Sequence, residues 1–332
     1  MTLNDILKER IVILDGAMGT MIQKYNLQEE DYRGERFKDF HTSLKGNNDL
    51  LVLTQPKIIK DIHREYLEAG ADLLETNTFN ANIISMLDYD MVDLVDELNY
   101  EAVRLAKEAC IEYSTPEKPR FVVGSLGPTN KTASISPQVN DPSYRDIDFD
   151  TLANVYYRQA KTMLEAGADA LLVETIFDTL NAKAAFFGIQ DAIDETGINV
   201  PLMASGTITD KSGRTLSGQT TEAFLISLEH IDLLSIGLNC ALGASDLIPY
   251  LEVLAEKAPF YVSAYPNAGL PNAFGGYDET AEMMLDNIRP FLDKKLVNII
   301  GGCCGSTPDH IKLMADLAKQ YEPRKIDERC QV

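Results

Sequence analysis

The sequence predicts an α/β protein built as a (β/α)8 TIM barrel with long strand-to-helix loop insertions. Three observations predict it: the chain length, the alternation of short apolar runs with helical patterns, and an internal repeat. The chain has 332 residues and is 45% hydrophobic, whereas a barrel of this class usually takes about 250 residues and grows through its loops. We therefore expect one barrel in residues 1–320, and a polar tail or linker toward a missing module in residues 321–332.

Eight short apolar runs mark the expected strands. Most are apolar at consecutive positions, which is typical of parallel strands covered on both faces. The runs are residues 11–16, 72–79, 121–127, 170–175, 201–208, 233–240, 261–267 and 297–304. A doubly wound open sheet is the alternative fold, but "DGAMGT" after the first run does not match the Gly-rich GxGxxG turn common in that fold.

Helical periodicity fills the intervals between these runs. In residues 57–70, the apolar side chains of Ile58, Ile62 and Tyr66 recur every four residues, and Gly70 marks a helix end. The stretch "EAGADLLET" from Glu68 returns as "EAGADALLVET" from Glu165, 97 residues later. Both copies carry a helix end into a strand, and the offset fits two strand–helix units with a long loop. The repeat therefore favours the barrel.

Two polar insertions interrupt the regular spacing. Residues 18–49 separate the first two expected strands, and residues 128–150 separate the third and fourth. Long strand-to-helix loops of a barrel lie on the face that carries the active site. We therefore expect both insertions to form the sides of a functional site.

Composition limits the partners and the compartment. The chain has 30 Lys and Arg against 51 Asp and Glu, for a net charge of −21, so nucleic acid and anionic membranes are poor partners. No apolar run reaches the roughly 18 residues of a membrane span, and no secretory leader is visible. We expect a cytoplasmic protein. Its five cysteines, two of them adjacent, do not suggest a secreted disulfide framework.

The residues that close the strands converge on one mouth if the barrel is correct. They are Asp15, Glu75, Gly127, Glu174, Thr207, Cys240, Asn267, Cys303 and Cys304. Three thiolates focused on one point are typical of a catalytic Zn²⁺ site that keeps a fourth position open for substrate. Gly301, Gly302 and Gly305 are expected to give the backbone the freedom that lets adjacent cysteines reach one ion.

Other interpretations of these residues remain open. A buried cysteine is often only a small apolar side chain, which is our interpretation of Cys110 and Cys330. A vicinal disulfide between Cys303 and Cys304 would make the protein a thiol redox switch rather than an enzyme. The turn at Thr307 and Pro308 could also begin a phosphate-binding helix, although phosphate needs backbone N–H groups and has no use for thiols.

Histidine and lysine chemistry lacks support in the expected mouth. His63, His230 and His310 fall in or beside helices, and we expect them at the surface or at helix ends. No histidine ends a strand, so a Ser-His-Asp mechanism is not favoured. No lysine ends one either, which argues against a Schiff-base mechanism.

The strand-end residues suggest activation of a thiol on a substrate that also carries a cation. A free thiol with a pKa of about 8.5 is only about 3% ionised at pH 7, so deprotonation by a metal ion gains roughly 30-fold in reactive thiolate. A zinc ion with three thiolate ligands carries net negative charge and keeps a bound thiolate nucleophilic. Asp15, Glu75 and Glu174 need a cationic partner if they are buried, such as a substrate ammonium group.

The motifs resemble the homocysteine-binding barrel of cobalamin-dependent methionine synthases over essentially the whole chain. The matching stretches include "ILDGAMGTMIQ", "ETNTFN", "VETIFDTLNAK", "GLNCALGA" and "GGCCGSTPDHI". The zinc motif also occurs in homocysteine methyltransferases that use betaine or S-methylmethionine, so it specifies only the superfamily. The loop motifs "GPTNKTASISP" and "NAGLPNAFG" favour the cobalamin-dependent enzymes.

The resemblance implies roles for individual residues. Cys240, Cys303 and Cys304 would ligate zinc, and Asn267 would fill the fourth position when substrate is absent. Residues in a second group would hold the amino-acid end of homocysteine and thereby select against simple thiols: Asp15, the amides of Gly16 and Ala17, and Glu174, with weaker arguments for Thr207 and Glu75.

The resemblance also implies the reaction and its partners. The barrel would supply zinc-bound homocysteine thiolate for an SN2-type attack on a methyl group, giving methionine. The donor would be methylcobalamin carried by another module, because such enzymes continue into cobalamin-binding and folate-binding modules. Betaine or S-methylmethionine is the alternative donor.

Overall fold

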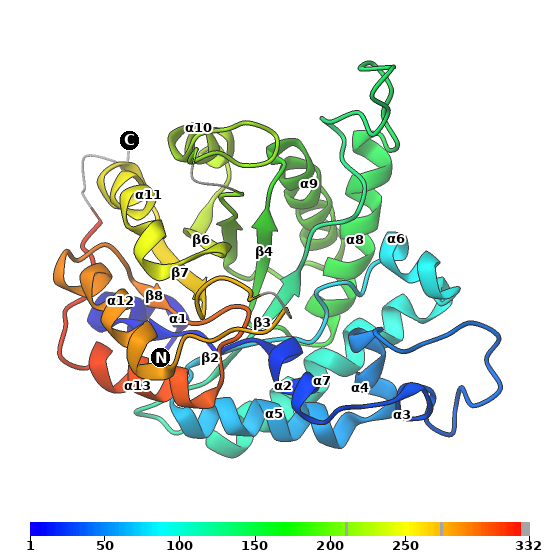
Figure 1. The fold of residues 1–332 in the computed structure, drawn as a ribbon, viewed down its shortest axis with the longest axis horizontal. Coiled ribbons are helices and arrows are strands. Elements are labelled where there is room, and N and C mark those ends of the chain that lie inside the picture. The colour runs from blue at the N-terminus through cyan, green and yellow to red at the C-terminus, as the bar shows by residue number, and fades with distance from the viewer. Residues whose placement is uncertain (210–211, 273–274, 327–332) are drawn as a thin grey trace.

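The computed structural model describes residues 1–209, 212–272 and 275–326. An eight-stranded parallel sheet curls into a barrel with helices around it (Figure 1), and its strand order is β1-β8-β7-β6-β5-β4-β3-β2. A parallel bridge between Leu14 and Leu73 joins the two ends of that order, and the amide of Asp15 donates to the carbonyl of Leu73 at 3.0 Å. The TIM-barrel prediction is confirmed.

Each of the eight apolar runs coincides with one strand; six strands lie within their runs, whereas β4 and β6 extend past theirs, to Ile176 and Gly243. The strands are β1 Val12–Ile13, β2 Leu73–Glu75, β3 Phe121–Leu126, β4 Ala170–Ile176, β5 Leu202–Gly206, β6 Leu233–Gly243, β7 Tyr261–Asn267 and β8 Ile299–Ile300. The runs that enclose β1, β2 and β8 extend past the regular ladder because their last residues turn into the mouth of the barrel.

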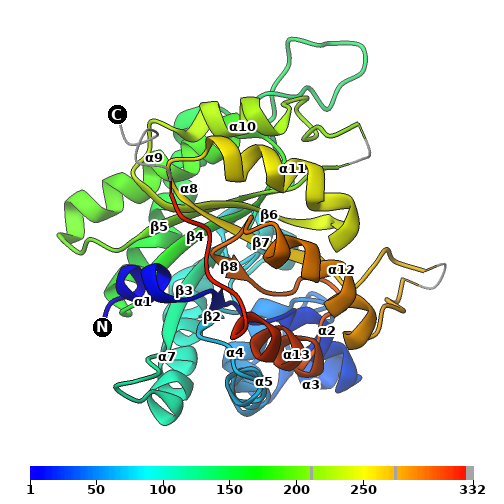
Figure 2. The same ribbon diagram turned by 90° about the vertical axis from the view of Figure 1, so that its left-hand side faces the viewer.

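One outer helix follows each strand. These helices are α5 Pro56–Ala69, α7 Val95–Tyr113, α8 Phe149–Glu165, α9 Thr179–Thr196, α10 Thr221–Leu228, α11 Ala244–Lys257, α12 Ala281–Asp293 and α13 Pro308–Ala318. Before β1, helix α1 (Leu3–Glu9) packs Leu3, Ile6 and Leu7 against side chains from the barrel interior, including Val12 and Ile299. Figure 2 shows α1 at the end of the barrel where the strands begin. The residues that follow the strands lie at the opposite end.

The internal repeat is a structural device that joins a helix to a strand. Gly70 and Gly167 take left-handed φ values of 114° and 91°, which end α5 and α8. The aspartate two residues later forms a hydrogen bond with the neighbouring strand. The carboxylate of Asp72 accepts from the main-chain amide of Ile13 in β1 at 3.0 Å. Asp169 does the same for the amide of Val122 at 2.7 Å.

The polar insertions are organised to different degrees. Residues 18–54 contain α2 Met18–Lys24, α3 Glu29–Arg33, η1 Asn48–Leu50 and α4 Leu51–Thr54. Glu29 ties this segment together, because its carboxylate accepts from the amides of Leu44 and Lys45. Residues 128–148 form a loop that projects from the barrel between β3 and α8 (Figure 1). A further insertion after β2, not predicted from the sequence, holds α6 Ile83–Met86, η2 Leu87–Tyr89 and η3 Val92–Leu94.

Two polar residues, His63 and Arg324, are buried where the sequence did not predict it. His63 was expected at the surface or a helix end but is fully buried in α5, and burial lowers its pKa to about 4. In the expected tail, Arg324 is buried and its guanidinium donates to three main-chain carbonyls, those of Ala255, Ala258 and Phe260. Cys330 lies outside the described residues.

No described helix is long and apolar enough to cross a membrane.

Candidate metal centre and carboxylate pocket

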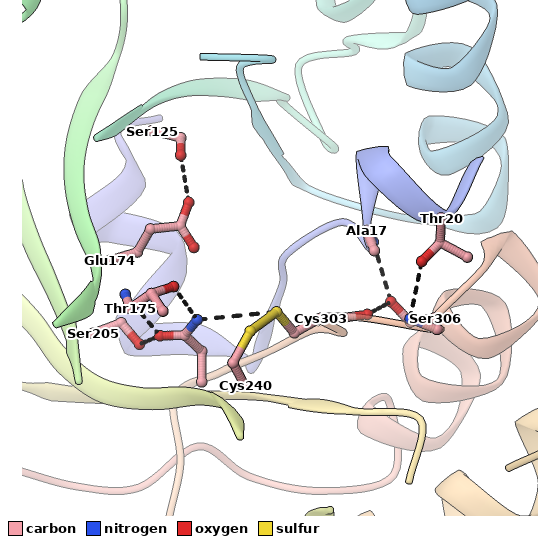
Figure 3. Close-up of a disulfide and its surroundings, with 11 residues drawn as sticks. Ala17, Thr20, Ser125, Glu174, Thr175, Ser205, Cys240, Cys303 and Ser306 are labelled. Carbon is pink, nitrogen blue, oxygen red and sulfur yellow. Dashed lines mark hydrogen bonds between the residues drawn. A yellow bond between two sulfur atoms is a disulfide. The ribbon is translucent and has the colours of Figure 1, made fainter. Parts of the chain in front are cut away.

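Three cysteine side chains meet at the mouth of the barrel. Cys240 lies in β6, and Cys303 and Cys304 follow β8. The three sulfurs lie within 4.8 Å of one another. Cys240 and Cys303 form a disulfide with Cα atoms 5.7 Å apart (Figure 3), while Cys304 is free and partly buried. In contrast, Cys110 is buried among apolar side chains of the outer layer.

The pairing differs from the vicinal disulfide considered in the sequence analysis. Cys303 pairs with Cys240 and not with its neighbour Cys304. The reason is geometric: disulfides usually join Cα atoms 4.4–6.8 Å apart, whereas consecutive Cα atoms are about 3.8 Å apart. The separation of 5.7 Å between Cys240 and Cys303 lies within the usual range.

Unusual backbone conformations direct the sulfurs to one point. Cys240 has a φ of 54°, in the left-handed region that non-glycine residues rarely adopt. Gly305 has a φ of 83°, as expected, but Gly301 and Gly302 have no positive φ. These two positions leave no space for a side chain. A Cβ on Gly302 would lie 2.4 Å from a Ser306 side-chain atom, and a Cβ on Gly301 would lie 2.8 Å from the Cβ of Leu14.

A buried oxygen lies at the end of the strand between β6 and β8. Asn267 ends β7, is 4% exposed, and has a side-chain Oδ1 atom with no hydrogen-bond partner among the described residues. Its neighbours are tied to the cysteine loop, because Ala268 donates to the carbonyl of Cys304 at 2.9 Å and Cys303 donates to the carbonyl of Pro266 at 2.8 Å. Three thiols and an unpaired oxygen are a donor set that fits a thiophilic cation such as Zn²⁺.

Tyr277 covers the outer side of Cys304. It comes from the segment after β7 and packs on the backbone of Gly305, where a Cβ would lie 2.4 Å from the Cβ of Tyr277. Burial and the neighbouring Cys304 thiolate raise the pKa of Tyr277 to about 12. The tyrosine is therefore neutral near pH 7 and adds no charge beside the sulfurs.

Three carboxyl groups lie in the same mouth, where Asp15 and Glu174 are buried and Glu75 is half-buried. Asp15, Glu75 and Glu174 come from the ends of β1, β2 and β4. Burial raises the pKa of Asp15 and of Glu75 well above the usual range, and raises that of Glu174 to about 7. Among the described residues, no Lys or Arg side chain offsets their charge. The carboxyl groups of the empty pocket therefore hold protons, and the pocket suits a cationic group of a ligand.

Hydrogen bonds orient these carboxyl groups only in part. Glu174 accepts from the hydroxyl of Ser125 (Figure 3), and one oxygen of Asp15 accepts from the amide of Glu75 at 3.2 Å. The Oδ1 atom of Asp15 and the Oε1 atom of Glu75 have no partner in the part of the chain that is described. Buried acceptors of this kind cost free energy until a donor arrives.

Gly16, Ala17 and Thr207 lie close to these groups in the sequence or in the fold. A Cβ on Gly16 would lie 2.8 Å from the ring of Tyr66 and 2.9 Å from the Ser306 hydroxyl, so only glycine fits there. The amide of Ala17 donates to that hydroxyl at 3.1 Å and is therefore engaged (Figure 3). Thr207 follows β5, where its amide donates to the carbonyl of Ile176 at 2.9 Å.

Sequence reasoning missed the polar residues that hold the site together. Ser125 orients Glu174, Ser306 links Ala17 to the carbonyl of Cys303, and Asn239 contacts both Thr175 and Cys303. A signal was available for Ser125 and Asn239, because each is a polar residue inside an otherwise apolar strand run and had to find a partner there.

The chain is similar to a protein family and to solved structures of known proteins. A model of the homocysteine S-methyltransferase family matches residues 12–318. Among solved structures, the homocysteine methyltransferase MmuM from Escherichia coli aligns in its metallated form with a TM-score of 0.72 and 19% identity, over 95% of this chain and 99% of that one. Its oxidized form aligns with a TM-score of 0.73 and 19% identity, over 95% and 98% of the two chains.

The structural likeness supports the fold, while the family model covers nearly the whole barrel, from β1 to α13. The matched region includes the three cysteines and the three carboxyl groups of the mouth. The chain therefore belongs to the homocysteine S-methyltransferase family.

Proposed function

We propose that the chain is a zinc-dependent homocysteine S-methyltransferase domain that transfers a methyl group from methylcobalamin to homocysteine, giving methionine. The observation that carries the proposal is the meeting of two complementary donor sets at one barrel mouth. Three sulfurs lie within 4.8 Å of one another, and three carboxyl groups without a cation lie at the ends of β1, β2 and β4. The first set suits a thiophilic metal ion, and the second suits an ammonium group.

Cys240, Cys303 and Cys304 would hold the zinc ion. When bound, zinc ionises a substrate thiol near neutral pH and leaves it nucleophilic. The unpaired Oδ1 atom of Asn267 would take the fourth position until the substrate arrives. Disulfide formation between Cys240 and Cys303 removes two of the ligands, so the reduced protein is the form that binds metal.

Asp15, Glu75 and Glu174 would bind the substrate ammonium group, since each lacks a cation of its own. The substrate carboxylate would lie against the amides of Gly16 and Ala17. Because the Ala17 amide already donates to Ser306, the serine hydroxyl must give way or share that donor. Thr207 would line the same pocket from the end of β5.

The choice of methylcobalamin as donor is supported by the loop motifs around residues 128–137 and 267–275. We propose that residues 1–320 form the homocysteine-binding barrel, and that residues 321–332 lead to cobalamin-binding and folate-binding modules of the same cytoplasmic enzyme. The exposed loop at residues 128–148 borders the mouth, where the donor module must present its methyl group.

Removal of one mouth cysteine tests the metal site. We expect the reduced protein to carry about one zinc ion per chain, and Cys240→Ser or Cys304→Ser to lose most of it. Native mass spectrometry with elemental analysis measures both. Cys110→Ser is the matched control, because Cys110 is a free cysteine that lies outside the sulfur cluster. Equal zinc content in all four proteins would contradict the site.

The pH dependence of amino-acid binding tests the carboxylate pocket. Methionine is the probe, because it carries the ammonium group but no thiol proton. The pKa of Glu174 is raised to about 7 in the empty pocket, so its ionised fraction rises about 10-fold from pH 6 to pH 8. An ammonium group binds the ionised form, and we expect methionine affinity to rise by a similar factor with pH in calorimetric titrations.

Two substitutions complete this test. Glu174→Gln should weaken methionine binding at pH 8 and flatten the profile. Glu222→Gln should change neither, because Glu222 pairs with Lys257 at the surface. A profile that stays equally steep in Glu174→Gln would show that another group controls ammonium binding.

The methyl donor is tested by offering each candidate separately to the reduced, zinc-loaded protein with homocysteine. We expect methionine to form with methylcobalamin and not with betaine or S-methylmethionine. Cys304→Ser should abolish the product. Activity with S-methylmethionine or betaine, and none with methylcobalamin, would replace our choice of donor while leaving the family assignment intact.

A thiol redox switch is the second candidate function, favoured by the Cys240–Cys303 disulfide. Oxidation of the two thiols by diamide forms one S–S bond and removes two zinc ligands, so we expect zinc release in step with disulfide formation. Peptide mapping should find Cys240 linked to Cys303 and Cys304 free. A Cys303–Cys304 product would contradict this pairing, and retention of zinc after full oxidation would contradict the ligand set.

A further inference from the structure

Asn239 is a fully buried amide that contacts both halves of the site. It lies in β6 directly before Cys240 and is 0% exposed. We propose that Asn239 is a positioning residue that holds the Cys303 sulfur and the Glu174 segment in a fixed relation. This inference rests on the proposed function, because it takes Cys303 as a metal ligand and Glu174 as a substrate-binding group.

The hydrogen bonds determine which way the amide points. The main-chain N–H of Thr175 can only donate, so the atom facing it at 3.1 Å is the Oδ1 of Asn239. The hydroxyl of Ser205 also donates to Oδ1, at 2.7 Å. The amide nitrogen therefore faces the Oγ1 of Thr175 at 2.9 Å and the sulfur of Cys303 at 4.0 Å (Figure 3). Both acceptor positions and both donor hydrogens of the amide have partners.

The contact with Thr175 stabilises a strained stretch of β4. Thr175 has a φ of 54°, a strained conformation that is rare for a β-branched residue. The ladder between β4 and β5 shifts register at this point. Asn239 bonds both the amide and the hydroxyl of Thr175, and so fixes the residue that follows Glu174. The direction of the Glu174 carboxyl group depends on this turn.

The contact with Cys303 acts on the other half of the site. An N–H group beside a thiolate offsets part of its negative charge and limits its rotation. Hydrogen-bond partners of metal ligands typically contribute 10- to 100-fold to metal affinity. Cys240, the next residue after Asn239, also has a left-handed φ of 54°. The Asn239 side chain thus links two distorted strands, β4 and β6, and contacts one of the three sulfurs.

The test uses Asn239→Asp, which keeps the shape and the acceptor oxygen but removes both N–H donors. Zinc affinity is measured by competition with a chelator, and the ligand field by the sulfur-to-metal charge-transfer absorption of the Co²⁺-loaded protein. Methionine affinity is measured by calorimetry. We expect zinc to bind 10- to 100-fold more weakly, the Co²⁺ absorption to shift, and methionine affinity to fall.

Asn298→Asp is the matched control at the opposite end of the barrel. Asn298 is also 0% exposed. Its Oδ1 accepts from the amide of Val262 at 3.0 Å, and its nitrogen donates to the carbonyl of Arg324 at 2.7 Å. The control should lose stability and keep the zinc and methionine affinities of the unaltered protein. Equal losses of zinc affinity in the two variants would reduce Asn239 to a structural role and overturn the proposal.

A milder pair of substitutions separates the two contacts. Thr175→Val removes the hydroxyl that Asn239 bonds and should weaken methionine binding while zinc affinity stays within about 2-fold. Thr175→Ser keeps the hydroxyl and should restore methionine affinity. Unchanged methionine binding in Thr175→Val, or zinc affinity in Asn239→Asp equal to that of the unaltered protein, would overturn the proposal. Failure of the unaltered protein to bind zinc would instead refute the proposed function.

Discussion

The site depends on three consecutive strands that deliver their donor atoms to one point. Strands β6, β7 and β8 are neighbours in the sheet; Cys240 lies near the end of β6, Asn267 ends β7, and the Cys303–Cys304 pair follows β8. Main-chain hydrogen bonds from Cys303 to Pro266 and from Ala268 to Cys304 hold the last two of these ends together beyond the regular ladder. Barrel closure between β1 and β2 then brings the carboxyl groups to the same mouth. The chemistry follows from this convergence, because none of the donors lies near all of the others in sequence.

The sequence carried enough information to predict the barrel because its strands are buried on both faces. Continuous apolar runs located every strand, and the repeat around Gly70 and Gly167 reflects a glycine helix end followed by an aspartate that accepts a hydrogen bond from the preceding strand. Burial of single polar residues was less predictable. His63 lies within a helix whose period alone does not say that a histidine faces the core, and Arg324 follows the last barrel helix in an aperiodic stretch. Tertiary packing decided both positions.

The candidate site could be predicted as a set of residue types but not as a set of bonds. The sequence shows cysteines and carboxylates at the expected strand ends, and the barrel topology brings them together. The Cys240–Cys303 pairing depends on a left-handed Cys240 backbone, which no spacing rule predicts. The engagement of the Ala17 amide by Ser306 joins residues 289 positions apart. The role that we propose for Asn239 depends on three partner residues that are distant in the sequence, namely Thr175, Ser205 and Cys303.

Under the proposed function, charge balance in the mouth would let a strongly acidic protein select an amino acid that carries a thiol. Burial keeps Asp15 and Glu75 protonated well above their usual range and Glu174 protonated to about pH 7, so the empty pocket avoids the cost of unpaired buried charge. A simple thiol leaves these protons in place and gains nothing from the carboxyl groups. An amino acid exchanges a proton for its ammonium group and gains an ion pair in a dry site. Selectivity against simple thiols therefore strengthens as the pH rises through the pKa of Glu174, and it arises from the carboxyl groups rather than from the sulfurs.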